Sequence, residues 1–520
     1  MTFDAIPNLA YSWNIFRNLW MLLPLLPLAG ILLMLVAHYG LSRDRSNLLF
    51  HIVICAQILI GLTLLAGAGL HGAESREIAV SVWDYAIVFR VEPLKIIHLG
   101  ILMIPLVLAL PKYQQIASPY LRMIFLFFLS GSSGVIVTGD IFNLFVFYEL
   151  MIMAAYVLVA AKKNFAESIK YMMFGSISSI AFLGGIIMLY AGGAPFNMDP
   201  TIFTTVPATN AWWAMVLFTF AFSVKSAFFP IALAPCHAAA GSIFSAFLAS
   251  FTIFTGMIGL HYLVLQPAVI LDMPAFYSLI RTLSILTIIM PSIILFWEPG
   301  YNRAVAQSTI MAIGITGLLL SYGAEEYAFL FVLVHAIYKS MLFMLDDDLQ
   351  QTARYLHVRS TATLCMLAIG AFLASGFSPG LTAHFKTEWE HATNWLQIVL
   401  LLSGFCVIGG FSKFRYSCEK PFRNPTSAWK SYAGYVLFAT MIFFFYHQLG
   451  MPPFWSQQAF MELAMLILAL LLGRKIYRMF PRLISLDRNW IYGLLNRQLF
   501  YIICLFAFIL LWLYPTSRQL

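Results

Sequence analysis

About sixteen apolar stretches, each long enough to cross a lipid bilayer as a helix, constrain this chain more than any other feature of its sequence. A window of about nineteen residues finds them, because the hydrocarbon core of a bilayer is spanned by about 20 apolar residues in a helix. The stretches lie near 19–39, 48–69, 93–110, 121–138, 141–161, 168–190, 212–230, 243–265, 277–297, 304–322, 327–345, 362–385, 395–412, 429–446, 459–473 and 498–514. The sequence therefore predicts an all-α integral membrane protein with about 14 to 16 transmembrane helices.

The composition agrees with a membrane protein. Of the 520 residues, 61% are apolar and 10% are charged, and the mean hydropathy is +0.85, which excludes a soluble globular domain. The first apolar run, Met21 to Ala37, is followed by no small-residue cleavage site. We therefore expect the first helix to be retained rather than removed as a signal peptide.

The positive charges predict the orientation of the chain in the membrane. Lys and Arg residues gather in alternate loops between the apolar stretches, about twenty in one set of loops against five in the other. Positive loops stay in the cytoplasm, so this split predicts both termini on the non-cytoplasmic side of a bacterial inner membrane. It also explains the basic pI without any binding of nucleic acid.

The cysteines give no sign of a cofactor. The six of them show no CxxC pair and no spacing typical of metal ligands. We expect no metal, no cofactor and no disulfide. The cysteines are Cys55, Cys236, Cys365, Cys406, Cys418 and Cys504.

Five lysines interrupt the apolar stretches: Lys95, Lys170, Lys225, Lys339 and Lys386. A lysine at bilayer depth costs at least about 2.5 to 3.5 kcal/mol, so it needs a partner, water or a function. A packing role is the alternative for any one of them, but five together favour function. Acids and histidines accompany the lysines in or beside the apolar stretches, namely Glu92, Asp140, Glu149, His98, His237, His261, His335 and His384.

Glu149 and Lys225 form the most informative combination. Burial lowers the pKa of an ammonium group in general, and a nearby carboxylate raises it again. A glutamate and a lysine on neighbouring helices therefore bind a proton when paired and release it when separated, without a cofactor.

Helix-breaking residues lie close to two of the lysines. Pro230, Pro235 and Gly241 come after Lys225, so no helix can run unbroken from Trp212 to Ala249. A second cluster, SGFSPG at Ser375–Gly380, precedes Lys386. Broken helices at membrane depth recur at ion sites, and two of them about 160 residues apart indicate an internal repeat.

Several segments resemble one known family. TGDIFNLFVFYELMIMAAYVLVA, ESIKY, VKSAFFP, APCHAAAGSIFSA, NRAVAQSTIMAIGITG, HAIYKSMLF and FPRLISLDRNWIY are similar to the antiporter-like membrane subunits of Mrp-type cation/proton antiporters, respiratory complex I and membrane-bound hydrogenases. The similarity weakens toward the C-terminus and is strongest to the D subunit of Mrp antiporters.

The resemblance implies two inverted repeats of five helices, each with one broken helix. The repeats would occupy 121–265 and 266–412, with flanking helices at 1–120 and 413–520. By the same resemblance Glu149, Lys225, His237, His335, Lys339 and Lys386 transfer protons, and Glu92, Lys95, Asp140, Lys170 and His261 are possible accessory residues.

Two departures from the family pattern stand out. Phe254 occupies the place of a relay lysine, and an aromatic ring cannot take up a proton; His261, two helical turns on, is a possible substitute. Asp346, Asp347 and Asp348 replace a small, glycine-containing stretch. They predict a solvated acidic turn, or alternatively a cation or docking site.

Four hypotheses follow, three of them functions and the fourth an inert scaffold that kept the fold after losing transport, which Phe254 would support and the retained Glu149, Lys225, Lys339 and Lys386 oppose. The first is a proton-translocating subunit of a multisubunit membrane complex, exchanging protons for Na⁺ in one form of the hypothesis. The second is an energy-coupling partner of an inorganic-carbon uptake or redox module, in which case the complex would be an enzyme resembling NADH:quinone oxidoreductase or hydrogenase. The third is an integral redox protein that binds haem or quinone, with His51, His98 and His261 as conceivable haem ligands.

Overall fold

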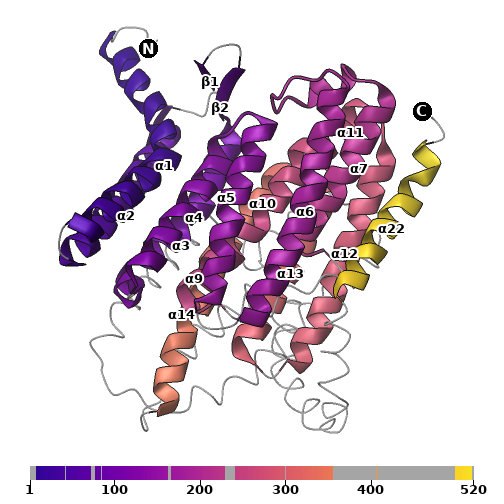
Figure 1. Cartoon of the computed structure of the whole chain (residues 1–520). Helices are drawn as coiled ribbons and strands as arrows, with labels where there is room; N and C mark the ends of the chain where they lie inside the picture. Colours follow the sequence, from indigo (N-terminus) through magenta and orange to yellow (C-terminus); the bar gives the residue numbers. More distant parts are fainter. Residues whose placement is uncertain are drawn as a thin grey trace, which may run out of the picture. The chain divides into compact units, whose positions relative to one another are not determined.

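The computed structural model forms two compact units, Met1–Ala221 and Phe222–Leu520. It describes residues 7–40, 43–71, 76–82, 85–116, 118–161, 165–228, 240–298, 300–354, 406 and 498–517 (Figure 1). Apart from Cys406, the four predicted apolar stretches between 362 and 473 lie outside the described residues, as do His237, His384 and Lys386.

The first unit consists of helices and one β-hairpin (Figure 1). Its elements are α1 (Pro7–Gly40), α2 (Arg43–His71), β1 (Arg76–Val82), β2 (Tyr85–Val91), α3 (Pro93–Leu108), the 3₁₀ helix η1 (Leu110–Gln115), α4 (Pro119–Val137), α5 (Ile141–Ala160), α6 (Phe165–Ala191), the 3₁₀ helix η2 (Pro200–Thr204) and most of α7 (Ala208–Lys225), which crosses the boundary.

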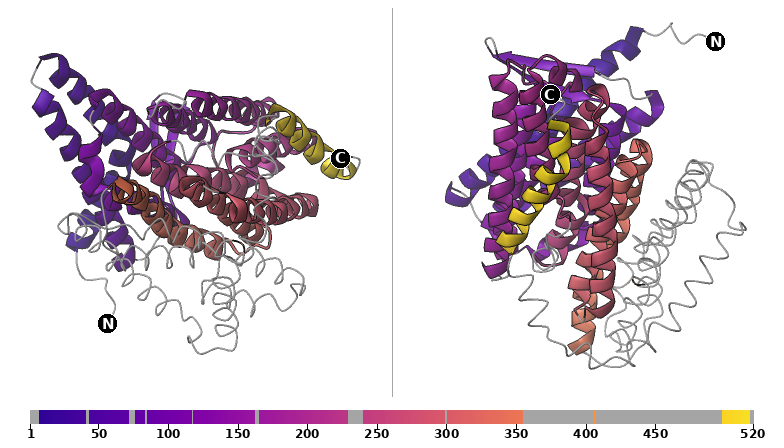
Figure 2. Two further views of the ribbon diagram at one scale, coloured as in Figure 1. Left: turned by 90° about the horizontal axis from the view of Figure 1, so that it is seen from below. Right: turned by 90° about the vertical axis from the view of Figure 1, so that its right-hand side faces the viewer.

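The second unit is helical throughout its described part. Its elements are α9 (Ser242–Phe247), η3 (Leu248–Thr252), α10 (Ile253–Leu260), η4 (His261–Leu265), α11 (Gln266–Ile270), α12 (Pro274–Trp297), α13 (Tyr301–Leu320), α14 (Glu325–Arg354) and α22 (Gln498–Ser517). Helix α13 packs between α12 and α14, and α22 lies along α12 (Figure 2).

Within the described residues, nine helices are long and apolar enough to cross a membrane. They include a continuous helical segment, Ser242–Ile270, made of α9, η3, α10, η4 and α11, which we call the Ser242–Ile270 span. The prediction of an all-α, multi-pass membrane protein is confirmed. The two inverted repeats stay a prediction.

Buried polar groups join three helices of the first unit. Pro27 lies inside α1 and has no N–H to donate to the carbonyl oxygen of Leu23, four residues before it. The side-chain Nε2 of Gln57, on α2, donates to this oxygen at 3.0 Å and to Ser133 Oγ, on α4, at 2.9 Å. Gln57 thus provides the hydrogen bond that the proline removes.

A close backbone approach brings α4 against α5. At Gly131 on α4, a Cβ atom would lie 2.5 Å from the backbone nitrogen of Met151 and 2.8 Å from the carbonyl oxygen of Phe147, both on α5. Only glycine fits at this distance. The contact fixes the position of α5, the helix that carries Glu149.

The β-hairpin adds one feature to the predicted fold. β1 and β2 pair antiparallel, from Arg76↔Val91 to Val82↔Tyr85. A nineteen-residue hydropathy window misses such strands because each has seven residues. β2 continues the pairing to the start of α5, where the backbone nitrogen of Gly139 donates to Val88 O at 2.7 Å.

The predicted helix break after Lys225 is confirmed. Helix α7 ends at Lys225, Ala227 has a φ of 56°, and a new helix begins at Ser242 after Gly241, whose φ is 84°. Positive φ at an alanine is costly and ends the helix locally.

Candidate functional site

In the first unit, Glu149 projects from the middle of α5. The carboxylate of this half-buried side chain accepts a hydrogen bond from Ser179 Oγ on α6. Helix α6 is itself tied to α7, because Ser178 Oγ donates to Ala221 O at 2.8 Å. The pair of serines that holds these contacts was not among the residues expected from the sequence.

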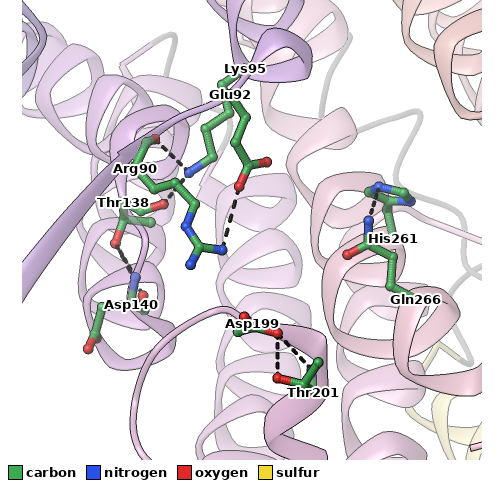
Figure 3. Close-up of polar contacts among 9 residues, drawn as sticks. All are labelled: Arg90, Glu92, Lys95, Thr138, Asp140, Asp199, Thr201, His261 and Gln266. Atoms are coloured by element: carbon green, nitrogen blue, oxygen red, sulfur yellow. Dashed lines mark hydrogen bonds and ion pairs between the residues drawn. The ribbon is translucent and has the colours of Figure 1, made fainter. Parts of the chain in front are cut away.

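A cluster of charged residues lies where β2, α3 and α5 begin or end (Figure 3). Lys95 is 3% exposed, and its ammonium group donates to the carbonyl oxygens of Arg90 at 2.9 Å and Thr138 at 2.5 Å. Glu92 forms an ion pair with Arg90 at 3.6 Å. Lys95 thus links β2 to the C-terminal end of α4.

The carboxyl pKa values of two aspartates near this cluster are shifted in opposite directions. The buried Asp140 caps α5 by accepting from Asn143 N at 2.7 Å, and its burial raises the pKa of the carboxyl against the effect of backbone hydrogen bonds. Asp199 accepts from Thr201 Oγ1 at 2.7 Å and Thr201 N at 2.9 Å, and the side-chain hydrogen bond lowers the pKa of Asp199.

Lys170 differs from the other lysines. It forms an i,i+3 ion pair with Glu167 at 3.1 Å, and the two side chains are 31% and 25% exposed. The pair lies in the first turns of α6. Lys170 belongs to the apolar stretch expected from the sequence, but it lies near the start of the helix and is partly exposed.

In the second unit, Lys225 is the last residue of α7 and is 7% exposed. The predicted pairing of Lys225 with Glu149, which belongs to the first unit, stays a prediction.

Lys339 is fully buried in the second unit. Its ammonium group donates to Val305 O at 2.7 Å and to Ser308 Oγ, both on α13. Within the described residues these hydrogen-bond partners are neutral oxygens. Burial makes the charged form of a lysine costly, and neutral hydrogen-bond partners offset only part of that cost.

His335 lies one helical turn before Lys339 on α14. Its Nδ1 lies 2.9 Å from the hydroxyl oxygen of Tyr338, and its Nε2 lies 3.3 Å from Ala249 O in the Ser242–Ile270 span. Ala249 belongs to the π-helical turn η3. A π-turn loosens the ordinary i→i−4 pattern of hydrogen bonds and recurs at functional sites.

The ring of Phe254 packs edge-on against His335, with the ring centroids 5.0 Å apart. Phe254 is 2% exposed. The residue at the family's relay-lysine position therefore contacts a predicted proton carrier without offering it a proton-binding atom.

His261 lies farther along the same span, at the start of the second π-turn, η4. Its Nε2 lies 3.1 Å from Gln266 Nε2, a contact drawn in Figure 3, and 3.4 Å from Glu325 Oε2 on α14. Glu325 was not expected as a site residue, because an acid in the first turn of a helix is also favoured by the helix dipole alone.

The prediction of an acidic turn at Asp346, Asp347 and Asp348 is wrong for the backbone. Helix α14 continues to Arg354, so the three aspartates are helical. No group of three or more His, Cys, Asp or Glu in the described ranges is arranged to hold a metal ion.

Comparisons with known proteins extend this description. The chain is 30% identical to the D subunit of the Na⁺/H⁺ antiporter of Bacillus subtilis over 241 residues, which is 43% of this chain and 47% of the relative. It is 26% identical to the N subunit of the NADH-quinone oxidoreductase of Desulforudis audaxviator over 309 residues, or 54% of this chain and 60% of the relative. The chain thus spans about half the length of these relatives.

Solved structures share the fold. A chain of an archaeal membrane-bound sulfane sulfur reductase complex aligns with a TM-score of 0.71 at 21% identity, covering 81% of this chain and 93% of that one. A chain of the Mrp complex from Dietzia sp. DQ12-45-1b aligns with a TM-score of 0.65 at 16% identity, covering 79% and 81%.

A family model for the transmembrane region of NADH:quinone oxidoreductase and Mrp antiporter subunits matches residues 138–408. This range begins at Thr138 and contains Glu149, Lys225, Phe254 and Lys339. It covers more than half of the chain, and so the resemblance read from the sequence is confirmed: the chain belongs to the NADH:quinone oxidoreductase/Mrp antiporter family of membrane proteins.

Proposed function

We propose that this chain is a proton-translocating subunit of a multisubunit membrane complex, located in the inner membrane of a bacterium with both termini on the non-cytoplasmic side. The observation that carries the proposal is Lys339, fully buried and hydrogen-bonded to the neutral oxygens of Val305 and Ser308. An ammonium group in such surroundings is suited to bind and release a proton during transport.

In this proposal, protonation of the first half is controlled by Glu149 and Lys225, which pair and separate. His237, His335 and Lys339 carry the proton onward, and Lys386 is the terminal lysine. Glu92, Lys95 and Asp140 are accessory. The similarity to a component of a Na⁺/H⁺ antiporter supports Na⁺ as the exchanged cation.

Proton flux in membrane vesicles tests the proposal. Cells that make the chain with its partner subunits are broken into vesicles, and a pH-sensitive dye reports proton movement after addition of Na⁺. We expect Lys225→Ala and Lys339→Ala each to abolish the flux while the complex still assembles. Lys112→Ala, in the 3₁₀ helix before α4, serves as the control and keeps the flux. Undiminished flux in both test variants would rule out the mechanism.

A second function uses the same site to couple proton movement to a redox or inorganic-carbon uptake module. The similarity to a component of NADH-quinone oxidoreductase favours the redox form. Identification of the proteins that copurify with the full chain separates the two functions, because electron-transfer subunits accompany only the redox form.

A further inference from the structure

The Ser242–Ile270 span and α14 run antiparallel and meet at a series of side chains. Ser250 Oγ lies 3.3 Å from Ser340 Oγ, Phe254 contacts His335, and His261 contacts Phe329, whose ring centroid is 5.7 Å away. Successive residues of the span thus face earlier and earlier residues of α14. The series ends at Glu325, the first residue of α14.

The last contact of this series combines a buried and an exposed proton-binding group. His261 is 1% exposed and Glu325 is 43% exposed, and 3.4 Å separates Nε2 from Oε2. Glu325 lies at the end of a membrane span, just after the turn at Gly323, whose φ is 76°. Its carboxylate therefore meets water or lipid head groups while the imidazole behind it is enclosed by protein.

Contacts with Gln266 and, through Leu265, with α12 hold His261 in place. Gln266 lies 3.1 Å from the same Nε2 atom, and Tyr277 Oη, from α12, donates to Leu265 O at 2.8 Å. Leu265 is the last residue of the π-turn that begins at His261. Each π-turn of the span thus has a carbonyl bonded by a neighbouring helix, Ala249 by His335 and Leu265 by Tyr277.

We propose that His261 and Glu325 form a proton-exchange site that connects the interior of the second unit with the aqueous phase. The site rests on the proposed function, which it deepens. The Glu325 carboxylate takes a proton from a hydronium ion and leaves a water molecule. Transfer then breaks the O–H bond of Glu325 as an N–H bond forms at His261 Nε2, and the Gln266 amide rotates so that its oxygen, rather than its NH₂ group, faces this atom; the reverse step releases the proton. At 3.4 Å the pair is longer than a strong hydrogen bond, so transfer needs a small approach of the two side chains.

The position of the pair distinguishes it from the site at Lys339. His335 and Glu325 are ten residues apart on α14, about 15 Å along the helix axis. The contact of α14 with the Ser242–Ile270 span is thus polar at His335 and at Glu325, and the rings of Phe254, Phe329 and Phe331 lie between these two places. Among the described residues, Tyr277 and Glu326 interact electrostatically with Glu325, and the ring of Tyr262 lies next to that of His261. Arg281, on α12, donates to Ser321 O and lies over the ring of Tyr322, in the turn before α14.

Flux measurements test the site with a matched control. His261→Gln keeps a hydrogen-bonding side chain but cannot carry a proton, and Glu325→Gln removes the exposed carboxylate. We expect each to lower proton flux by roughly tenfold or more, and to change its dependence on pH. Glu325→Asp should restore part of the flux. Asp272→Asn, which removes an exposed carboxylate in the turn after the Ser242–Ile270 span, should leave the flux unchanged.

A His261–Glu325 contact that only stabilises the fold gives a different result. Its loss lowers the flux by the same factor at every pH and lowers the thermal stability of the solubilised complex. Loss of a proton carrier instead changes the pH profile of the flux while the complex stays stable. Flux in His261→Gln equal to that of the unaltered chain, or an unchanged pH profile, overturns the proposal.

A second measurement separates this inference from the proposed function. Infrared spectra of the purified complex are recorded as the pH is changed, and the carboxylate band that disappears in Glu325→Gln is assigned to Glu325. We expect His261→Gln to change the pH at which this band is lost. An unchanged titration overturns the site even if the unaltered complex moves protons. Absence of flux in the unaltered complex would instead contradict the proposed function.

Discussion

Two buried lysines, Lys95 and Lys339, are held by oxygen atoms of the backbone. Lys95 donates to Arg90 O and Thr138 O, and Lys339 donates to Val305 O. The sequence could identify both lysines, because a charged side chain in an apolar stretch is conspicuous. It could not identify these partners, because every residue has a carbonyl group and only the fold selects which one is used.

Asp140 gives a prediction of stability against pH. Burial raises the pKa of its carboxyl, so the ionised form destabilises the folded state at neutral pH, and this cost disappears as the pH falls through the raised pKa. Asparagine caps a helix as well as aspartate does. We expect Asp140→Asn to raise the thermal unfolding midpoint at pH 7, and the gain to vanish in acid. A circular-dichroism melt of the solubilised chain measures both.

Asp199 supplies the opposite case and serves as a comparison for Asp140. The hydrogen bond from Thr201 lowers the pKa of Asp199, so its ionised form stabilises the fold above the ordinary aspartate range, and this contribution is lost as the pH falls below it. We expect Asp199→Asn to lower the midpoint slightly at pH 7 and to have no effect in strong acid. Equal behaviour of the two asparagine variants would contradict this assignment of charges.

At the scale of single elements, hydropathy and the positions of prolines predict where helices lie and where they end, and local periodicity predicts less. The end of α7 at Lys225 follows from Pro230, Pro235 and Gly241, since proline and glycine act on the backbone directly. The two π-turns in the Ser242–Ile270 span have no such sign. They depend on contacts with α12 and α14, which a single sequence does not record.

Gln57 gives a prediction for the packing of α1, α2 and α4. Gln57→Leu removes the hydrogen bonds to Leu23 O and Ser133 Oγ, and leaves the carbonyl freed by Pro27 unbonded in an apolar setting. Hydrogen bonds between membrane helices contribute about 0.6 to 1.7 kcal/mol. We expect a loss of free energy of unfolding in this range, measured by detergent titration of the purified chain.

Leu59 provides the control for Gln57. It lies on the same helix, two residues on, and is 65% exposed. Leu59→Val should therefore change the free energy of unfolding by much less than Gln57→Leu. A similar loss for both variants would show that general weakening of α2, rather than the two hydrogen bonds, is responsible.

At the scale of the whole molecule, the fold class and the family could be predicted from the sequence. Long apolar stretches identify a multi-pass helical membrane protein, because the bilayer allows so few alternative structures. The β-hairpin could not be predicted in this way, because its strands are short and lie between spans. The partners of Glu149 and Glu325 depend on how helices distant in sequence pack together.

The loop charges lead to a prediction for the topology of the chain. Positive residues in alternate loops place Lys162 and Lys163 in the cytoplasm and both termini on the other side. We expect alkaline phosphatase to be active when fused to either terminus and inactive when inserted between Lys162 and Lys163. A reporter that is active at only one terminus would mean an odd number of crossings.

The π-turns of the Ser242–Ile270 span also bear on how sequences of this family are to be aligned. The π-turn Leu248–Thr252 holds one residue more than an α-helical turn for nearly the same rotation about the helix axis. Loss of one residue there would convert it to ordinary α-helix and leave Phe254 and His261 facing α14, whereas the same loss in the ordinary α-helix after it would rotate everything that follows by about 100°. A one-residue gap placed at this turn of an alignment therefore keeps the set of side chains that face α14, and a gap placed a few residues later exchanges those that follow it.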